Sequence, residues 1–329
     1  MRFAIQKIGA VFALFQLCAS TAIADPLLED TEWLRTMVFA AQRTNYSGVF
    51  VYQSGERVEM SRITHIFDKD GVHERLVGLN GPRREVVRNN DKIWLYVDDN
   101  KVRFEKRYAK SGFPALLPVQ IQNLKENYRI SQGEEDRVAE YHAHTILFQP
   151  KDNLRYTRKM WAHSESGLLL KAVVLDERGR LIEQYAFSQL SIGGDADHHW
   201  MIVPNETGAT RLAEKINLAP LPIVSIESAP TGWQVDAVPS GFKKIIEIRR
   251  TMRDKKLPVV QIVYSDGLAS ISVFIEQASE ANDPSLGLTS QGAVHISSRW
   301  VGDHLVTVVG EVPPRTVVEV ADSVRYAGK

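Results

Sequence analysis

Two histidines placed two residues apart are the strongest sign of site chemistry in this chain of 329 residues. In a strand, His142 and His144 would share one face, where two imidazoles could bind a zinc ion together. The sequence supplies no linked third ligand, and the adjacent His198 and His199 would point to opposite faces of a strand. We interpret these histidines as ordinary strand residues and predict no metal site and no cofactor.

The residues that enzymes use for covalent or hydrolytic chemistry do not form a recognisable set. The sequence holds no Gly-x-Ser-x-Gly, His-Glu-x-x-His, Gly-x-Gly-x-x-Gly or phosphate-binding loop motif. Glu134 and Glu135 follow Gly133 in a segment typical of a polar turn, where solvated charge is the simpler explanation. Cys18, the only cysteine, lies in a segment that we expect to be removed. We therefore predict a binding protein and not an enzyme.

Aromatic residues are frequent in the strands predicted for the first half of the chain. A curved sheet too wide to fill its own concave side can leave an apolar pocket, although the same rings could form an ordinary core. If Trp94 lines such a pocket, Trp94→Ala should weaken lipid binding; otherwise it should only destabilise the fold. The candidates for a lipid pocket are Phe50, Tyr52, Trp94, Tyr96, Phe104, Phe148 and Trp161.

Basic residues concentrate between 243 and 256, where seven cations oppose two acidic residues. The whole chain has 40 basic and 40 acidic residues, so its charge gives no support for nucleic-acid binding. The local excess suits an acidic peptide or a phosphorylated lipid head group, and a solvated hairpin tip is the simpler alternative. A weaker excess lies at Arg83, Arg84, Arg88, Lys106 and Arg107. The partner-binding candidates are Phe242, Lys243, Lys244, Arg249, Arg250, Arg253, Lys255 and Lys256.

The first 24 residues have the features of a secretory signal peptide in the expected order. Arg2 and Lys7 give a positive start, Ile8–Leu17 is an apolar run too short to span a bilayer, and Ala22-Ile23-Ala24 matches the cleavage pattern. We expect residues 1–24 to be removed and the mature protein to be periplasmic, without disulfides. A lipid anchor at Cys18 is less favoured because large residues precede it.

A first amphipathic helix is predicted to begin at Asp25-Pro26. After it, apolar and polar residues alternate with a period of two along most of the chain, as they do in strands. Turns rich in Gly, Asn and Asp separate the runs, which predicts an antiparallel meander in one large curved sheet. The stretch Phe113–Asn127, punctuated by proline, is predicted to be helical. The expected strands are Ser47–Gln53, Glu56–Phe67, His73–Leu79, Arg84–Arg88, Lys92–Val97, Lys101–Arg107, Ala139–Phe148, Tyr156–Ala162, Leu168–Leu175 and Arg180–Leu190.

A second, smaller domain is predicted beyond a segment with several prolines. We place the N-terminal domain at 25–205, the linker at 206–230 and the C-terminal, partner-binding domain at 231–329. Limited proteolysis is expected to cut first between Gly193 and Pro230. The smaller domain should hold an antiparallel sheet and a last helix after Pro313-Pro314. Its expected strands are Gly241–Arg249, Pro258–Tyr264, Ser270–Glu276, Ala293–Trp300 and His304–Gly310.

Motifs spread in order along the whole mature chain resemble the RseB/MucB family of periplasmic sigma-factor regulators. The most specific is Pro150–Tyr156, which runs on to Trp161 and Gly167–Lys171. Glu140 and Thr157 depart from the family pattern, since each stands where a glycine is expected, and Ala162-His163 replaces an apolar–Asp pair. The other matching segments are Tyr46–Tyr52, Arg62–His65, Leu79–Arg88, Asp136–Ala139, Glu183–Phe187, Gly232-Trp233 and Pro239–Phe242.

The resemblance implies an α+β protein with a large antiparallel half-barrel sheet and helices, similar to the carriers LolA and LolB. A smaller C-terminal antiparallel sheet with a helix is implied as well. Its implied function is negative regulation of the envelope-stress sigma-factor response. Members bind the periplasmic part of a membrane anti-sigma factor (RseA or MucA) and shield it from site-one proteolysis. Lipid or lipopolysaccharide displaces them from that partner.

Two other classes of function compete with a regulator. A periplasmic lipid or lipoprotein carrier would need only the first domain, so the second domain favours the regulator. An envelope hydrolase would need convergent Ser, His and Asp residues or metal ligands that the sequence does not assemble. The sequence does not determine the oligomeric state, and a homo-oligomer is one alternative.

Overall fold

The computed structural model describes residues 26–97, 100–105, 112–118, 121, 123–194, 231–250, 257–277 and 286–328, without the side chains of 26–31, 100–105 and 250. The predicted signal peptide, the predicted linker and the candidates Arg253, Lys255 and Lys256 lie outside these residues.

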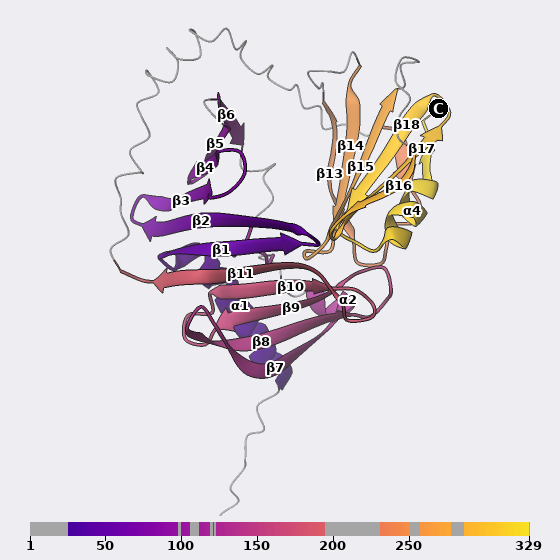
Figure 1. Cartoon of the computed structure of the whole chain (residues 1–329). Coiled ribbons are helices and arrows are strands. Elements are labelled where there is room, and N and C mark those ends of the chain that lie inside the picture. The colour runs from indigo at the N-terminus through magenta and orange to yellow at the C-terminus, as the bar shows by residue number, and fades with distance from the viewer. Residues whose placement is uncertain are drawn as a thin grey trace, which may run out of the picture.

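The described residues form two antiparallel sheets, a two-stranded pair and three helices (Figure 1). The elements of the first part are α1(Pro26–Arg43), β1(Tyr46–Ser54), β2(Arg57–Asp68), β3(Gly71–Gly78), β4(Arg84–Asn89), β5(Lys92–Val97), β6(Asn100–Glu105), α2(Leu124–Asn127), β7(Tyr128–Val138), β8(Tyr141–Pro150), β9(Thr157–His163), β10(Leu169–Leu175) and β11(Leu181–Ile192). Those of the second part are β12(Trp233–Val235), β13(Lys243–Arg250), β14(Val259–Ser265), β15(Ser270–Gln277), β16(Gly287–Gln291), β17(Val294–Val301), β18(His304–Gly310), α4(Pro314–Asp322) and β19(Val324–Tyr326).

The large sheet has eleven strands in the order β6-β5-β4-β3-β2-β1-β11-β10-β9-β8-β7. Each strand from β1 to β6 and from β7 to β11 pairs with the next along the chain, and β11 pairs with β1, so that β6 and β7 form the two edges. The predicted fold class, a large antiparallel half-barrel sheet plus a smaller sheet with a helix, is confirmed.

One face of the large sheet forms the main core against α1. Period-two alternation puts Phe50, Ile63, Phe148 and Met160 on this inner face, where all four are buried with residues of the helix. The buried helix residues Leu34, Met37, Val38 and Ala41 follow the helical spacing that the sequence predicts.

Two local predictions about the large sheet were wrong. Among the described residues of the stretch predicted to be helical, only Leu124–Asn127 forms a helix, because the prolines before it cannot continue one. Glu134 and Glu135 do not form a turn: they lie in edge strand β7, beside an irregularity in its pairing with β8. At Glu140, where the family pattern has glycine, φ is 73°, so this non-glycine residue occupies the left-handed region.

The small sheet has six strands in the order β13-β14-β15-β18-β17-β16, and α4 packs on one of its faces (Figure 1). Ile271, Val273 and Val306 from the sheet and Val317 and Val320 from the helix are fully or almost fully buried in this core. Strand β16 at the edge and the pair β12–β19 were missed by the sequence prediction.

The two sheets meet through a buried arginine that the large-sheet part inserts into the small-sheet part. The Arg155 side chain is 0% exposed, and its Nε donates to Asp266 Oδ2 at 2.6 Å. The guanidinium also bonds to Asp152 and to the Ser240 carbonyl, and its carbon lies 4.8 Å from the centre of the Phe242 ring. This buried set fixes one part of the molecule on the other.

Candidate binding site

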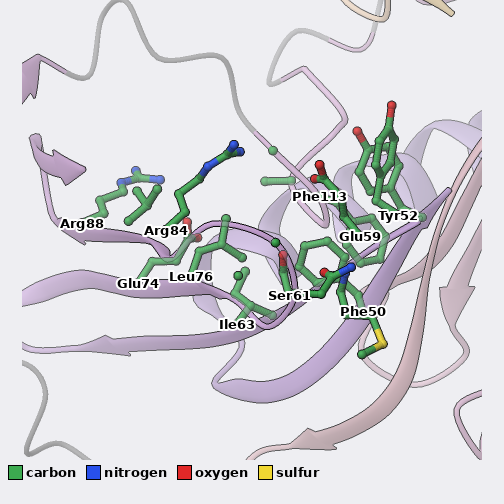
Figure 2. A pocket seen from close by; sticks show the side chains of 18 of the residues that line it. Phe50, Tyr52, Glu59, Ser61, Ile63, Glu74, Leu76, Arg84, Arg88 and Phe113 are labelled. Atoms are coloured by element: carbon green, nitrogen blue, oxygen red, sulfur yellow. The ribbon is translucent and has the colours of Figure 1, made fainter. Parts of the chain in front are cut away.

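A cavity of about 1310 Å³ opens on the inner face of the large sheet, beside the segment that follows β6 (Figure 2). Its size suits a ligand with acyl chains better than a small metabolite. Strands β1 to β5 and β11 provide most of the wall. The lining residues are Phe50, Tyr52, Arg57, Val58, Glu59, Met60, Ser61, Ile63, Glu74, Leu76, Gly78, Asn80, Gly81, Pro82, Arg84, Val86, Arg88, Asp91, Ile93, Gly112, Phe113, Ala115 and Tyr185.

Aromatic rings form one wall of the cavity. The Phe113 ring stacks on Tyr185 with centroids 5.6 Å apart and an angle of 11° between the planes. Tyr185 lies 4.7 Å from Tyr52, and Phe50 lies 5.1 Å from Phe113. Ring faces and edges without polar atoms favour contact with hydrocarbon.

The opposite end of the cavity is polar and holds Arg84, Arg88 and Glu74 (Figure 2), and Asp91 also lines the cavity. Arg84 is exposed and Arg88 is half-buried. Glu74 is the strand partner of Arg88, and burial raises the pKa of this carboxyl while Arg88 opposes that effect. A cavity with an aromatic wall and a charged end fits an amphipathic ligand.

His65 lies on the same inner face, buried at 1% exposure. Its ring stacks on Tyr46, with centroids 4.9 Å apart, and its Nδ1 lies 2.9 Å from the Thr44 carbonyl oxygen. Burial lowers the pKa of His65 from 6.5 to about 4. The unfolded chain therefore binds a proton that the folded protein excludes.

We expect His65 to make the folded protein less stable as the pH falls. Its contribution is complete above about pH 6.5 and is lost as the pH falls toward 4. Between pH 7 and pH 4.5, the free energy of unfolding of the wild type should fall by about 2 kcal/mol more than that of His65→Phe, measured by urea unfolding. The same pH profile in both proteins would contradict the assignment.

The cavity contains two of the seven predicted lipid-pocket residues, Phe50 and Tyr52. Phe148 is 0% exposed and belongs to the core instead. Trp94 and Tyr96 alternate with Ile93, which lines the cavity, and therefore lie on the opposite face of β5. For Phe104 the structure describes the backbone and not the side chain.

Trp161 also lies away from the cavity, on the outer face of β9. Its neighbour Met160 belongs to the inner core, so alternation turns the indole outward. There Lys159 and Lys171 place their Nζ atoms 4.7 Å and 4.5 Å from the ring centre, and the indole N–H donates to Asp136 at 2.8 Å. This tryptophan is buried in a separate hydrophobic cluster with Val138, Leu170 and Val173.

Sequence reasoning missed several cavity residues, among them Ile63, Leu76, Phe113 and Tyr185. The first two alternate with outward residues in predicted strands, so the period-two pattern was a usable signal. Strand pairing then brings them together, since Ile63 is the Cα partner of Leu76. Phe113 follows β6 outside any strand, and no local pattern marks it.

The partner-binding candidates are spread over different environments. Phe242 is buried against Arg155, so its ring is part of the contact between the sheets. Lys244 pairs with Glu247 at 2.5 Å. Arg249 donates to the Thr231 carbonyl at 3.0 Å.

Lys243 is exposed at the start of β13, which is an edge strand of the small sheet. Arg250 ends this strand, and its side chain lies outside the described atoms.

Within the described ranges, no three His, Cys, Asp or Glu residues gather as metal ligands would. His142 and His144 do share one strand face, and His144 Nδ1 lies 3.7 Å from the exposed Glu135. None of the described helices combines the length and the hydropathy of a membrane span.

The fold and the cavity define a binding protein of two parts, an open half-barrel with an apolar cavity and a smaller sheet docked on it. The chain belongs to the MucB/RseB family. The model of the MucB/RseB N-terminal domain matches residues 29–204, and the model of the C-terminal domain matches residues 227–325.

Curated relatives match along almost their whole length. The sigma factor AlgU regulatory protein MucB of Pseudomonas aeruginosa is 31% identical over 299 residues, 90% of each chain. The sigma-E factor regulatory protein RseB of Escherichia coli K12 is 27% identical over 297 residues, 89% of each chain. Among solved structures, the MucA/MucB complex of Pseudomonas aeruginosa matches with a TM-score of 0.70 and 27% identity. That match covers 92% of this chain and all of the other.

Proposed function

We propose that this protein is a negative regulator of an envelope-stress sigma factor and binds the periplasmic part of a membrane anti-sigma factor. The observation that carries this proposal is the similarity to MucB, which has been crystallised in complex with MucA(peri), at a TM-score of 0.69 over 91% of this chain. Binding would shield the partner from site-one proteolysis. The signal-peptide pattern of residues 1–24 supports a periplasmic location.

Lipid or lipopolysaccharide is the proposed signal that the cavity senses. The aromatic wall would contact acyl chains, and Arg84 and Arg88 would meet an anionic head group. The competing proposal, a lipid or lipoprotein carrier, rests on the same cavity. The small-sheet part favours the regulator, since a carrier needs no second sheet.

The partner surface is proposed to include the basic stretch from Lys243 to Lys256. Charge reversal at Lys243, Arg250 and Arg253 should weaken binding of the anti-sigma segment by about tenfold at low salt. The difference should shrink as salt screens the charges. Arg249 is kept, because its bond to Thr231 is part of the fold.

A matched control for this prediction reverses Lys69, Arg83 and Arg178, three exposed cations of the large-sheet part. The control should bind as the wild type does, and both triple variants should keep the wild-type melting curve. If calorimetry gave the two variants equal affinity for the anti-sigma segment, the basic stretch would not be part of the interface.

A further inference from the structure

The turn between β16 and β17 of the small sheet packs tightly on the end of β1. Gly292 has φ +61°, and a Cβ atom there would lie 1.9 Å from the Ser54 hydroxyl oxygen. The next residue, Ala293, is 1% exposed and packs with Tyr156 and Val174 of the large sheet. Such close contact leaves little room for adjustment, so a small shift on either side would separate the two surfaces.

Glu183 connects this turn to the cavity. Its carboxylate lies beside the turn, with Oε2 3.6 Å from the position that a Cβ atom on Gly292 would take, and it accepts a hydrogen bond at 3.1 Å from the Tyr52 hydroxyl. The Tyr52 ring lines the cavity, in contact with Tyr185. Glu183 is half-buried, and burial raises the pKa of its carboxyl while the hydrogen bond from Tyr52 opposes that effect.

We propose that Tyr52 and Glu183 transmit occupation of the cavity to the contact between the two sheets. This inference rests on the proposed binding of lipid. A ligand that displaces the Tyr52 ring removes the hydroxyl from Glu183, and the carboxylate then turns toward water. The turn loses its contact with Glu183 at Gly292, and the β16–β17 turn separates from β1.

Thermodynamic linkage requires the coupling to act in both directions. If ligand binding shifts the equilibrium toward the released turn by a given factor, the ligand's affinity for a protein whose turn is already released is higher by the same factor. The Arg155–Asp266 contact lies elsewhere in the interface, so the small sheet stays attached while its turn is released.

Hydrogen exchange of the segment 287–301 in the full mature protein tests this path. Tyr52→Phe keeps the ring and removes the hydroxyl, and the matched control Tyr185→Phe removes a second hydroxyl from the cavity wall. Without ligand, the turn should exchange about tenfold faster in Tyr52→Phe than in the wild type, and the control should stay within about twofold. Unchanged exchange in Tyr52→Phe would overturn the inference.

The second arm adds lysophosphatidylglycerol as the probe, below its micelle concentration. It should accelerate exchange of the turn in the wild type and in Tyr185→Phe, and have no further effect in Tyr52→Phe. If the probe binds the wild type without changing hydrogen exchange of the turn, the coupling is overturned and the lipid proposal stays intact. A wild type that binds no probe would contradict lipid binding and remove the trigger, while the first arm would still report on the hydrogen-bond path.

Discussion

Arg155→Met should lower the free energy of unfolding by about 3–5 kcal/mol, because it leaves the buried carboxylate of Asp266 without its cation. Both side chains are 0% exposed. Asp266 also accepts from the Tyr128 hydroxyl at 2.9 Å and from the backbone N–H groups of Leu268 and Ala269. These neutral donors remain in the variant and cannot balance the charge. Urea unfolding followed by tryptophan fluorescence measures the loss.

The matched control for this prediction is Arg180→Met. Arg180 pairs with Asp176 at a similar distance, 2.7 Å, but is 72% exposed, so its loss should cost less than about 1 kcal/mol. Asp266→Leu added to Arg155→Met removes the unpaired charge and should recover part of the loss. Equal costs for Arg155 and Arg180 would show that burial of the pair does not stabilise the contact between the sheets.

Gly78→Trp should weaken lipid binding by about 15- to 60-fold, because the indole would occupy space that an acyl chain needs. Each methylene kept out of an apolar site costs about 0.8 kcal/mol, and the indole displaces roughly two to three of them. Gly78 lines the cavity, and a Cβ there meets nothing closer than 3.6 Å, so the backbone accepts a side chain. Displacement of a dansylated fatty acid measures the affinity.

Val77→Trp is the control for the cavity variant. Val77 is the neighbouring residue of β3, on the opposite face, so the same side chain is added without filling the cavity. This control should bind the fatty acid as the wild type does. If both tryptophan variants or neither variant lost binding, the lipid would have to bind outside the cavity.

The large sheet could be predicted because its local signals agree with each other. Alternation and turn residues mark β1 to β5, and Lys92–Val97 of β5 agrees residue for residue with its prediction. Strand β7 was not predicted from the sequence, because its exposed polar residues from Gln132 to Arg137 show no alternation of apolar and polar side chains. Its only strong signal is pairing with β8, which is a long-range property.

The cavity could be predicted as a kind of site but not residue by residue. Phe50 and Tyr52 were identified because the sheet was expected to be curved and aromatic. Trp94 and Trp161 were assigned to the same pocket because the composition of a strand does not reveal which of its two faces looks inward. Which face looks inward depends on the register with the neighbouring strands. A register shift of one residue moves every side chain of the strand to the other face of the sheet.

The buried Arg155 shows a second limit of sequence reasoning. The sequence placed it in the segment Pro150–Tyr156, which carries the family resemblance, but gave no reason for its role. Its partner Asp266 is 111 residues away, in the other part of the molecule. A charged residue within a polar turn is usually solvated, and only the packing of the two sheets reveals that this one is not.

Titration of the mature protein with the periplasmic segment of the membrane anti-sigma factor from the same genome tests the central claim most directly. Calorimetry should show a saturable complex, and the segment should become resistant to the site-one protease when bound. An unrelated segment of equal length and charge should give no heat and no protection. Separate migration of the two components in gel filtration at micromolar concentrations, with the segment cleaved as fast as when free, would contradict the proposed function.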